Sequence, residues 1–141
     1  MLESVMLIDD NKHDNFFHET AINDTGLAKE VVKYQSAEKA LSYLSEAAAN
    51  ETGVPPLILL DINMPGMNGW EFLEEYQKLP HVAQQRTVII MLTTSNNPND
   101  CERAKSEPAL KGFLNKALTE EMFNEIVKTH FFNPTSLTSL Q

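Results

Sequence analysis

Residues 57–69 read LILLDINMPGMNG, four large apolar side chains followed by an aspartate and a run of loop-forming residues. An apolar run of this length, with two prolines before it and an acid after it, is typical of a strand buried on both faces. The Pro, Gly and Asn residues of the second half interrupt regular structure. The stretch therefore predicts a buried strand over residues 57–60, with Asp61 at its carboxyl end and a loop behind it.

Similar apolar runs recur along the chain and alternate with segments of helical periodicity. The predicted strands span residues 5–8, 31–32, 57–60, 88–92 and 112–116. The predicted helices begin near residues 11, 36, 70, 97 and 119. In the first helix, Phe16, Phe17, Thr20 and Ala21 have the spacing of one helix face. Five strands in alternation with five helices predict an α/β fold, a doubly wound parallel sheet with helices on both faces.

The composition is that of one acidic domain. The 141 residues carry 20 Asp and Glu against 11 Lys and Arg, a formal charge of -9, so we expect no direct binding of nucleic acid. No apolar run approaches the ~20 residues of a membrane helix, and the first residues lack the features of a signal peptide. We therefore expect a cytoplasmic protein without membrane insertion. The single cysteine, Cys101, excludes an internal disulfide.

Polar side chains follow most of the predicted strands. The carboxyl ends of parallel strands meet at one edge of a sheet, where open α/β sheets bind their ligands. The residues expected at this edge are Asp9, Asp10, Asp61, Thr93, Thr94 and Lys116. We therefore expect them to form one site.

The acids at this edge indicate a metal and a phosphoryl group. Carboxylates ~4 Å apart repel one another by about 4 kcal/mol per pair at an effective dielectric constant of about 20, and a bound cation removes this cost. Oxygen ligands without His or Cys, with positions left for water and phosphate, favour Mg²⁺. A carboxylate beside such an ion can attack phosphorus and form an aspartyl phosphate. A lysine and a threonine hydroxyl would stabilise the transferred charge.

The motifs of this edge resemble the receiver domain of two-component response regulators, over most of the chain. The motifs are Asp9-Asp10, the loop over residues 61–69, Met91-Leu92-Thr93 and Lys116. The resemblance implies a flavodoxin-like fold with the strand order 2-1-3-4-5. We expect a receiver domain over residues 1–132, a short C-terminal tail over residues 133–141 and no output domain.

The resemblance also implies a role for each acid. Asp61 would be the phosphoacceptor, which receives its phosphoryl group from a histidine kinase or a histidine phosphotransfer protein. Asp10 and Asp61 would coordinate Mg²⁺ directly, together with the backbone carbonyl of Asn63. Asp9 would contribute mainly through a bound water.

Other residues would respond to the phosphoryl group or adjust its lifetime. Thr93 would be the switch hydroxyl and Lys116 its charged partner, although the spacing alone leaves Thr94 as an alternative to Thr93. Phe113 lies where receivers carry an aromatic that changes rotamer on activation. Asn63 and Ser95, each two residues past a key position, lie where receivers adjust phosphoryl lifetime.

One position departs from the receiver pattern. Receivers usually have proline after the lysine, joined by a cis peptide bond, and here Lys116 is followed by Ala117. A cis bond before a residue other than proline is unfavourable. Two alternatives stay open: either the bond is cis, or it is trans and Lys116 moves away from the site.

The first hypothesis for function is a signalling switch, not an enzyme, that acts by binding an unknown downstream protein or by passing the phosphoryl group onward. A first alternative is a degenerate receiver that binds its partner without phosphorylation. A second is a Mg²⁺-dependent phosphohydrolase with an Asp nucleophile. Such enzymes need a second carboxylate two residues after the nucleophile, where this chain has Asn63.

Overall fold

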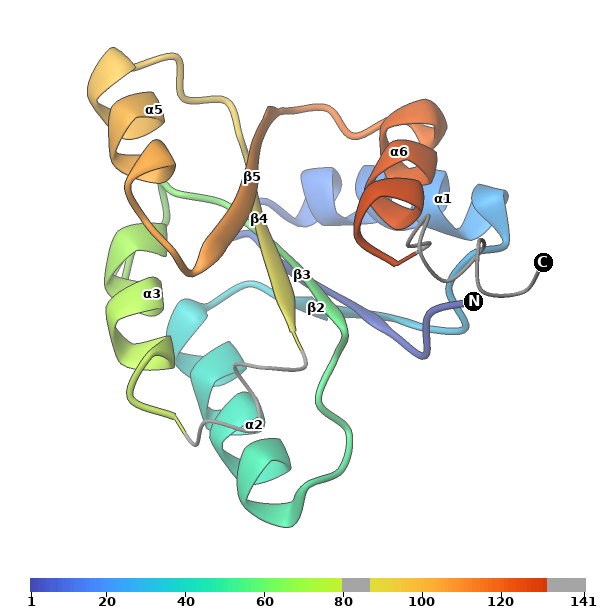
Figure 1. The fold of residues 1–141 in the computed structure, drawn as a ribbon, viewed down its shortest axis with the longest axis horizontal. Helices are drawn as coiled ribbons and strands as arrows, with labels where there is room; N and C mark the ends of the chain where they lie inside the picture. Colours follow the sequence, from blue (N-terminus) through green and yellow to red (C-terminus); the bar gives the residue numbers. More distant parts are fainter. Residues whose placement is uncertain (80–86, 132–141) are drawn as a thin grey trace, which may run out of the picture.

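The computed structural model describes residues 1–79 and 87–131, which form three layers with a parallel sheet in the middle (Figure 1). The strands are β1 (Val5–Ile8), β2 (Val31–Tyr34), β3 (Leu57–Leu60), β4 (Val88–Thr93) and β5 (Leu110–Asn115). All pair in parallel, in the order β2-β1-β3-β4-β5. The predicted fold class and strand order are confirmed.

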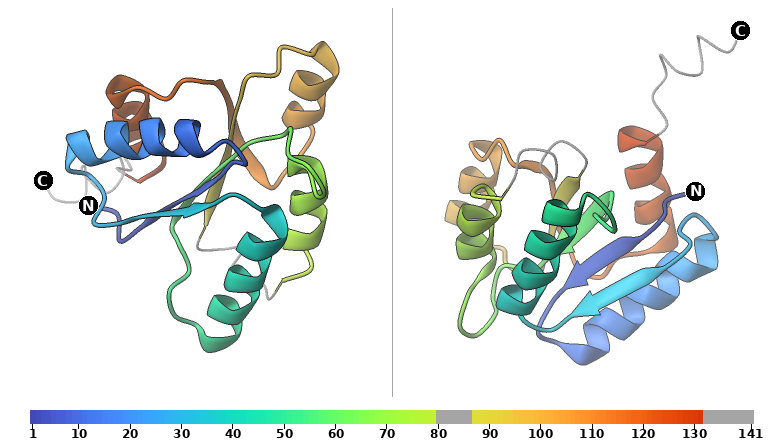
Figure 2. Two further views of the ribbon diagram at one scale, coloured as in Figure 1. Left: turned by 180° about the vertical axis from the view of Figure 1, so that it is seen from behind. Right: turned by 90° about the horizontal axis from the view of Figure 1, so that it is seen from below.

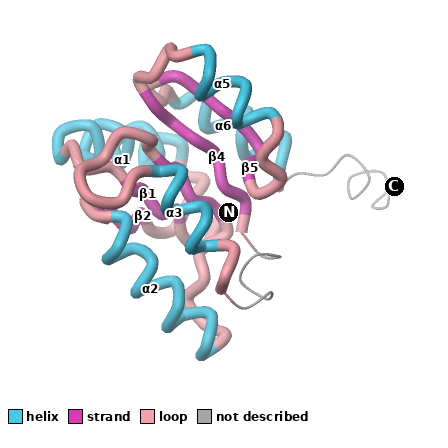
Figure 3. The backbone as a smooth tube through the Cα atoms, turned by 90° about the vertical axis from the view of Figure 1, so that its left-hand side faces the viewer, coloured by secondary structure: helices cyan, strands magenta, loops and turns pink. Residues whose placement is uncertain are grey.

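The described residues form five helices, four between successive strands and one after β5, as the sequence pattern predicts. They are α1 (Lys12–Thr25), α2 (Ala37–Asn50), α3 (Gly69–Tyr76), α5 (Pro98–Lys105) and α6 (Glu120–His130), with labels as in Figure 1. The helices α2, α3 and α5 cover one face of the sheet, while α1 and α6 cover the other (Figure 2). Viewed from the side of α2 and α3, these helices lie in front of the strands (Figure 3).

The core has two halves because successive strand residues point to opposite faces of the sheet. Met6 and Ile58 pack toward α2 and α3, in a cluster that includes Phe72. Leu7 and Leu59 pack toward α1 and α6, in a second cluster. Strands buried on both faces explain why their sequences are continuous apolar runs.

Helix α1 does not use the apolar face that the sequence pattern predicts. Phe16 and Phe17 are 66% and 55% exposed, whereas the buried residues of α1 are Asn15, His18 and Ile22. The side chain of Asn15 donates a 2.8 Å hydrogen bond to the backbone carbonyl of Asp9. This bond, together with the packing of Ile22, turns the other side of the helix toward the sheet.

The sequence also predicts a C-terminal tail and no membrane-spanning helix. The expected tail over residues 133–141 lies outside the described residues. Within the described part, none of the helices has the length and apolar character needed to cross a bilayer.

Candidate functional site

The acids of the site follow two neighbouring interior strands, β1 and β3. Ile8 of β1 and Leu60 of β3 are paired in register, so the residues after them, Asp9 and Asp61, emerge together at the edge of the sheet. Both are nearly buried, at 4% and 6% exposure, while Asp10 is exposed. One carboxylate oxygen from each of the three acids lies within 4.8 Å of the others. The predicted acid cluster is therefore present.

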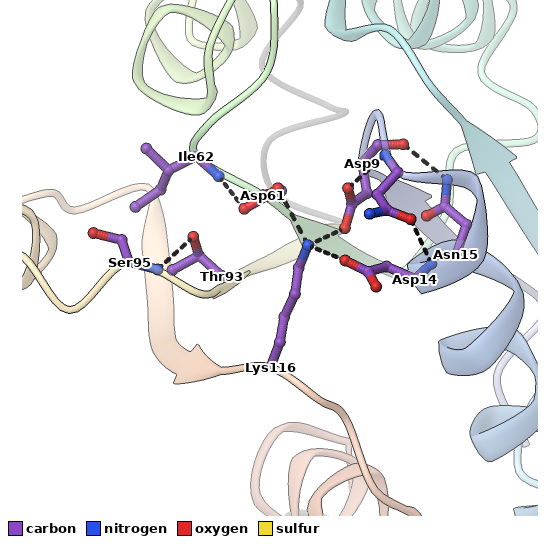
Figure 4. Close-up of polar contacts among 9 residues, drawn as sticks. Asp9, Asp14, Asn15, Asp61, Ile62, Thr93, Ser95 and Lys116 are labelled. Carbon is purple, nitrogen blue, oxygen red and sulfur yellow. Dashed lines mark hydrogen bonds and ion pairs between the residues drawn. The ribbon is translucent and has the colours of Figure 1, made fainter.

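Lys116 enters this cluster from the segment after β5 (Figure 4). Its Nζ lies 2.5 Å from Asp9 Oδ2, 2.8 Å from Asp14 Oδ2 and 3.3 Å from Asp61 Oδ2. The Lys116–Ala117 peptide bond is cis. Of the two alternatives left by the sequence, the structure has the one in which the ammonium reaches Asp61.

Burial and charge act in opposite directions on the ammonium and on its nearest partner. Burial favours the neutral form of Lys116, but hydrogen bonds to Asp14 and Asp9 outweigh it and raise the lysine pKa. For Asp9, burial outweighs the attraction of Lys116, so the pKa of this carboxyl is raised. The carboxylates of the site outnumber its one ammonium, which leaves negative charge in a nearly buried place. A divalent cation would stabilise such a site.

The hydroxyl of Thr93 lies at the end of β4, next to the strand that carries Asp61. Thr93 is fully buried, whereas Thr94 is exposed. Thr93 Oγ1 accepts a 3.2 Å hydrogen bond from the backbone N–H of Ser95 (Figure 4). The Ser95 hydroxyl in turn donates to Asp100 Oδ2, at 2.7 Å. Thr93 and Ser95, both predicted for the site, are thus joined by a hydrogen bond where β4 ends.

Two glycines allow the backbone path of the loop after Asp61. Gly66 has a φ of +76°, a conformation that favours glycine. The backbone N–H of Gly69 donates to the carbonyl of Ile62, at 2.8 Å. A Cβ on Gly69 would lie 2.5 Å from the backbone oxygen of Asp61. Glycine at position 69 therefore lets the start of α3 pass directly against the backbone of Asp61.

Two other predicted residues lie near this edge. Asn63 is exposed in the loop after Asp61, and the role of its carbonyl stays a prediction. Phe113 is half-buried on β5 and packs against the cluster shared by α2 and α3. A switch role for Phe113 stays a prediction as well.

Three residues of α1 belong to the site and were not predicted. Asp14 contacts Lys116, and Asn15 donates to the carbonyl of Asp9. His18 is 2% exposed, and burial lowers its pKa, with a smaller contribution from the charge of Lys116. The available signal was their spacing, since residues 14, 15 and 18 lie on one side of a helix that begins next to Asp10.

Similarity to known proteins agrees with this geometry. The sequence model of the response regulator receiver domain matches residues 5–128. The chain belongs to this family. The response regulator receiver domain is a signalling module of two-component systems, and the acidic cluster of Asp9, Asp10 and Asp61 fits phosphorylation and Mg²⁺ binding.

Individual receivers match at the level of sequence and fold. Response regulator Rcp1 of Synechocystis is 29% identical over 97 residues, which span 68% of this chain and 65% of Rcp1. A two-component response regulator from Cytophaga hutchinsonii superimposes with a TM-score of 0.85 at 29% identity, covering 94% of this chain and 98% of that one. The Mn²⁺-bound form of response regulator Rcp1 has the same fold, with a TM-score of 0.72 at 21% identity over 94% and 96% of the two chains.

Proposed function

We propose that this receiver is a phosphoryl-accepting switch in which Asp61 takes a phosphoryl group and the aspartyl phosphate changes how the protein binds a partner. The observation that carries the proposal is the position of Lys116 Nζ, 3.3 Å from Asp61 Oδ2 and next to the other acids. A nearly buried lysine beside a nearly buried carboxylate is suited to stabilise charge that arrives on that carboxylate.

The hydrogen bonds of Asp61 favour one of its oxygens as the nucleophile. Oδ1 accepts a 2.8 Å hydrogen bond from the backbone N–H of Ile62, which fixes the plane of the carboxylate. Oδ2 is the oxygen nearest Lys116. In the proposed reaction Oδ2 attacks phosphorus, the bond between phosphorus and the donor breaks, and Lys116 neutralises one oxygen of the transferred group. The Thr93 hydroxyl then loses its hydrogen bond from the backbone N–H of Ser95 and donates to another oxygen of the phosphoryl group.

The residues present fit a magnesium ion. The acids supply only oxygen ligands, and their clustering is unfavourable without a cation. Asp10, Asp61 and the carbonyl of Asn63 would hold the ion, and Asp9 would contribute through water. When bound, it would neutralise charge on the phosphoryl oxygens. The related Rcp1 has a Mn²⁺-bound form, which supports the binding of a divalent ion by this chain.

The two alternatives find less support. Asn63, two residues after Asp61, has an amide that cannot serve as a general acid, which disfavours a phosphohydrolase. The contact between Lys116 and Asp61 favours phosphorylation over constitutive partner binding. The protein would act in the cytoplasm, where a sensor histidine kinase or a histidine phosphotransfer protein would be the donor. The output would be binding of a downstream protein or onward transfer.

The test is phosphorylation by acetyl phosphate in MgCl₂, followed by intact-protein mass spectrometry. The wild-type protein should gain one phosphoryl group, and the same mixture with EDTA should leave it unmodified. The isosteric variant Asp61→Asn should gain none. A phosphoryl group that persists in Asp61→Asn, or an unmodified wild-type protein, would overturn the proposal.

A further inference from the structure

Asp14 contacts the reacting centre and has no part in the roles described above. Its Oδ2 lies 2.8 Å from Lys116 Nζ, between the distances to Asp9 and Asp61. Asp14 comes from α1 and is not one of the acids whose oxygens cluster for a metal. Lys116 is therefore bound to two kinds of carboxylate, those placed to hold a cation and one that is not.

We infer that Asp14 is a positioning residue, which holds the Lys116 ammonium at the site once a metal ion engages the other acids. The inference rests on the proposed function, because it assigns Asp14 to the same reaction. It deepens that function by explaining how one lysine and one metal ion can share neighbouring carboxylates.

The need for such a residue follows from competition for oxygen atoms. An ammonium has three N–H donors, and in the structure Lys116 has three carboxylate partners, Asp9, Asp14 and Asp61. A cation held by the acid cluster would bind Asp61 directly and Asp9 through water. It would therefore compete with the ammonium for these oxygens and repel it. Lysine has a flexible stem and leaves easily when its partners are lost. A carboxylate outside the metal cluster would keep it in place.

The position and the exposure of Asp14 suit it to be that partner. It lies in the first turn of α1, where its backbone N–H donates a 3.0 Å hydrogen bond to the side chain of Asn11. This cap fixes the helix end from which the carboxylate projects. The Asp14 side chain is 37% exposed, against 8% for Lys116. Water can therefore satisfy the carboxylate oxygen that Lys116 does not use.

A simpler explanation is that Asp14 adds one more negative charge near the metal. The two explanations differ in whether the effect of Asp14 requires Lys116. Asp24 provides the matched control, because it lies on the same helix, is exposed and would lose the same charge in Asp24→Asn.

The experiment measures Mg²⁺ affinity with MgCl₂ alone, by calorimetry, and the Lys116 ammonium signal in lysine-labelled protein by ¹⁵N NMR. We expect Asp14→Asn to weaken Mg²⁺ binding about tenfold and to remove the ammonium signal in saturating MgCl₂. In Asp14→Glu and in Asp24→Asn, the Mg²⁺ affinity and the ammonium signal should both stay close to those of the wild type. In the Lys116→Met background, Asp14→Asn should change affinity by less than about twofold.

Several outcomes would overturn the inference. Equal weakening by Asp14→Asn with and without Lys116 would show that only its charge matters, and so would equal effects of Asp14→Asn and Asp24→Asn. An ammonium signal that survives in Asp14→Asn with MgCl₂ would show that other partners suffice. Absence of Mg²⁺ binding by the wild type would overturn it too, whereas Mg²⁺ binding without phosphorylation by acetyl phosphate would overturn the proposed function alone.

Discussion

The side chains of Trp70 and Asp100 join two helices that cover the same face of the sheet, through a 3.1 Å hydrogen bond from the indole N–H to Asp100 Oδ1. The other oxygen of Asp100 accepts from the hydroxyl of Ser95. Ser95 in turn donates its backbone N–H to Thr93. A change in the position of Thr93 would thus be transmitted through the turn after β4 to the environment of Trp70.

Trp70 should therefore report phosphorylation in a way that depends on Thr93. The chain has one tryptophan, so its fluorescence is specific to this position. We expect acetyl phosphate with MgCl₂ to change the emission of the wild-type protein and to leave that of Thr93→Ala nearly unchanged. Thr93→Ser keeps the hydroxyl and should respond like wild type. A full response in Thr93→Ala would show that the hydroxyl does not transmit the change.

Removal of Lys116 should destabilise the metal-free protein. Lys116→Met leaves Asp9 and Asp61 nearly buried without their cationic partner, which we expect to cost about 3 kcal/mol in the free energy of unfolding. Urea denaturation in EDTA measures this loss. Addition of MgCl₂ should recover most of it, because the metal replaces the lost positive charge. Equal stabilities of variant and wild type in EDTA would contradict the ion pairs of the structure.

The buried histidine of α1 predicts a loss of stability in mild acid. The pKa of His18 is lowered from 6.5 by burial, so below that pH the unfolded chain binds a proton more readily than the folded one. The contribution of neutral His18 is complete above pH 6.5 and is lost as the pH falls through the lowered folded pKa. His18→Gln should therefore flatten the stability profile in acid. His13→Gln, an exposed position on the same helix, should leave the profile as in wild type.

The close approach of Gly69 to the backbone of Asp61 predicts sensitivity to a single methyl group. In Gly69→Ala the new Cβ would lie 2.5 Å from the Asp61 backbone oxygen, and we expect a loss of about 2 kcal/mol in unfolding free energy together with slower phosphorylation. In Gly112→Ala the Cβ would meet Ile90 at 3.5 Å, an ordinary contact. Urea denaturation should separate the two variants, and similar losses in both would contradict this account.

The fold and the acids could be predicted from the sequence because the pattern is local. The third strand spans residues 57–60 in both the prediction and the structure. An acid directly after a buried parallel strand lies at the carboxyl edge of the sheet. This placed Asp9 and Asp61 together without any knowledge of their contacts.

The contact of Lys116 with Asp14 could not be predicted, because the two residues are far apart in the sequence. Lys116 and Asp14 are 102 positions apart, and no local pattern connects them. The face of α1 was predicted wrongly for a related reason. Phe16 and Phe17 suggested the buried side, but Asn15 anchors the helix to the carbonyl of Asp9 and turns that side toward the sheet.

Asp9 and Asp61 follow β1 and β3, two interior strands of the sheet. The amide of Asp9 bonds to Tyr34 of β2 and that of Asp61 to Ile8 of β1, so these amides should exchange with deuterium only when the centre of the domain opens. Thr93 ends β4, another interior strand, whereas Lys116 follows β5, a strand at the edge of the sheet. We therefore expect deuterium to reach the backbone around Lys116 before it reaches the amides of Asp9 and Asp61.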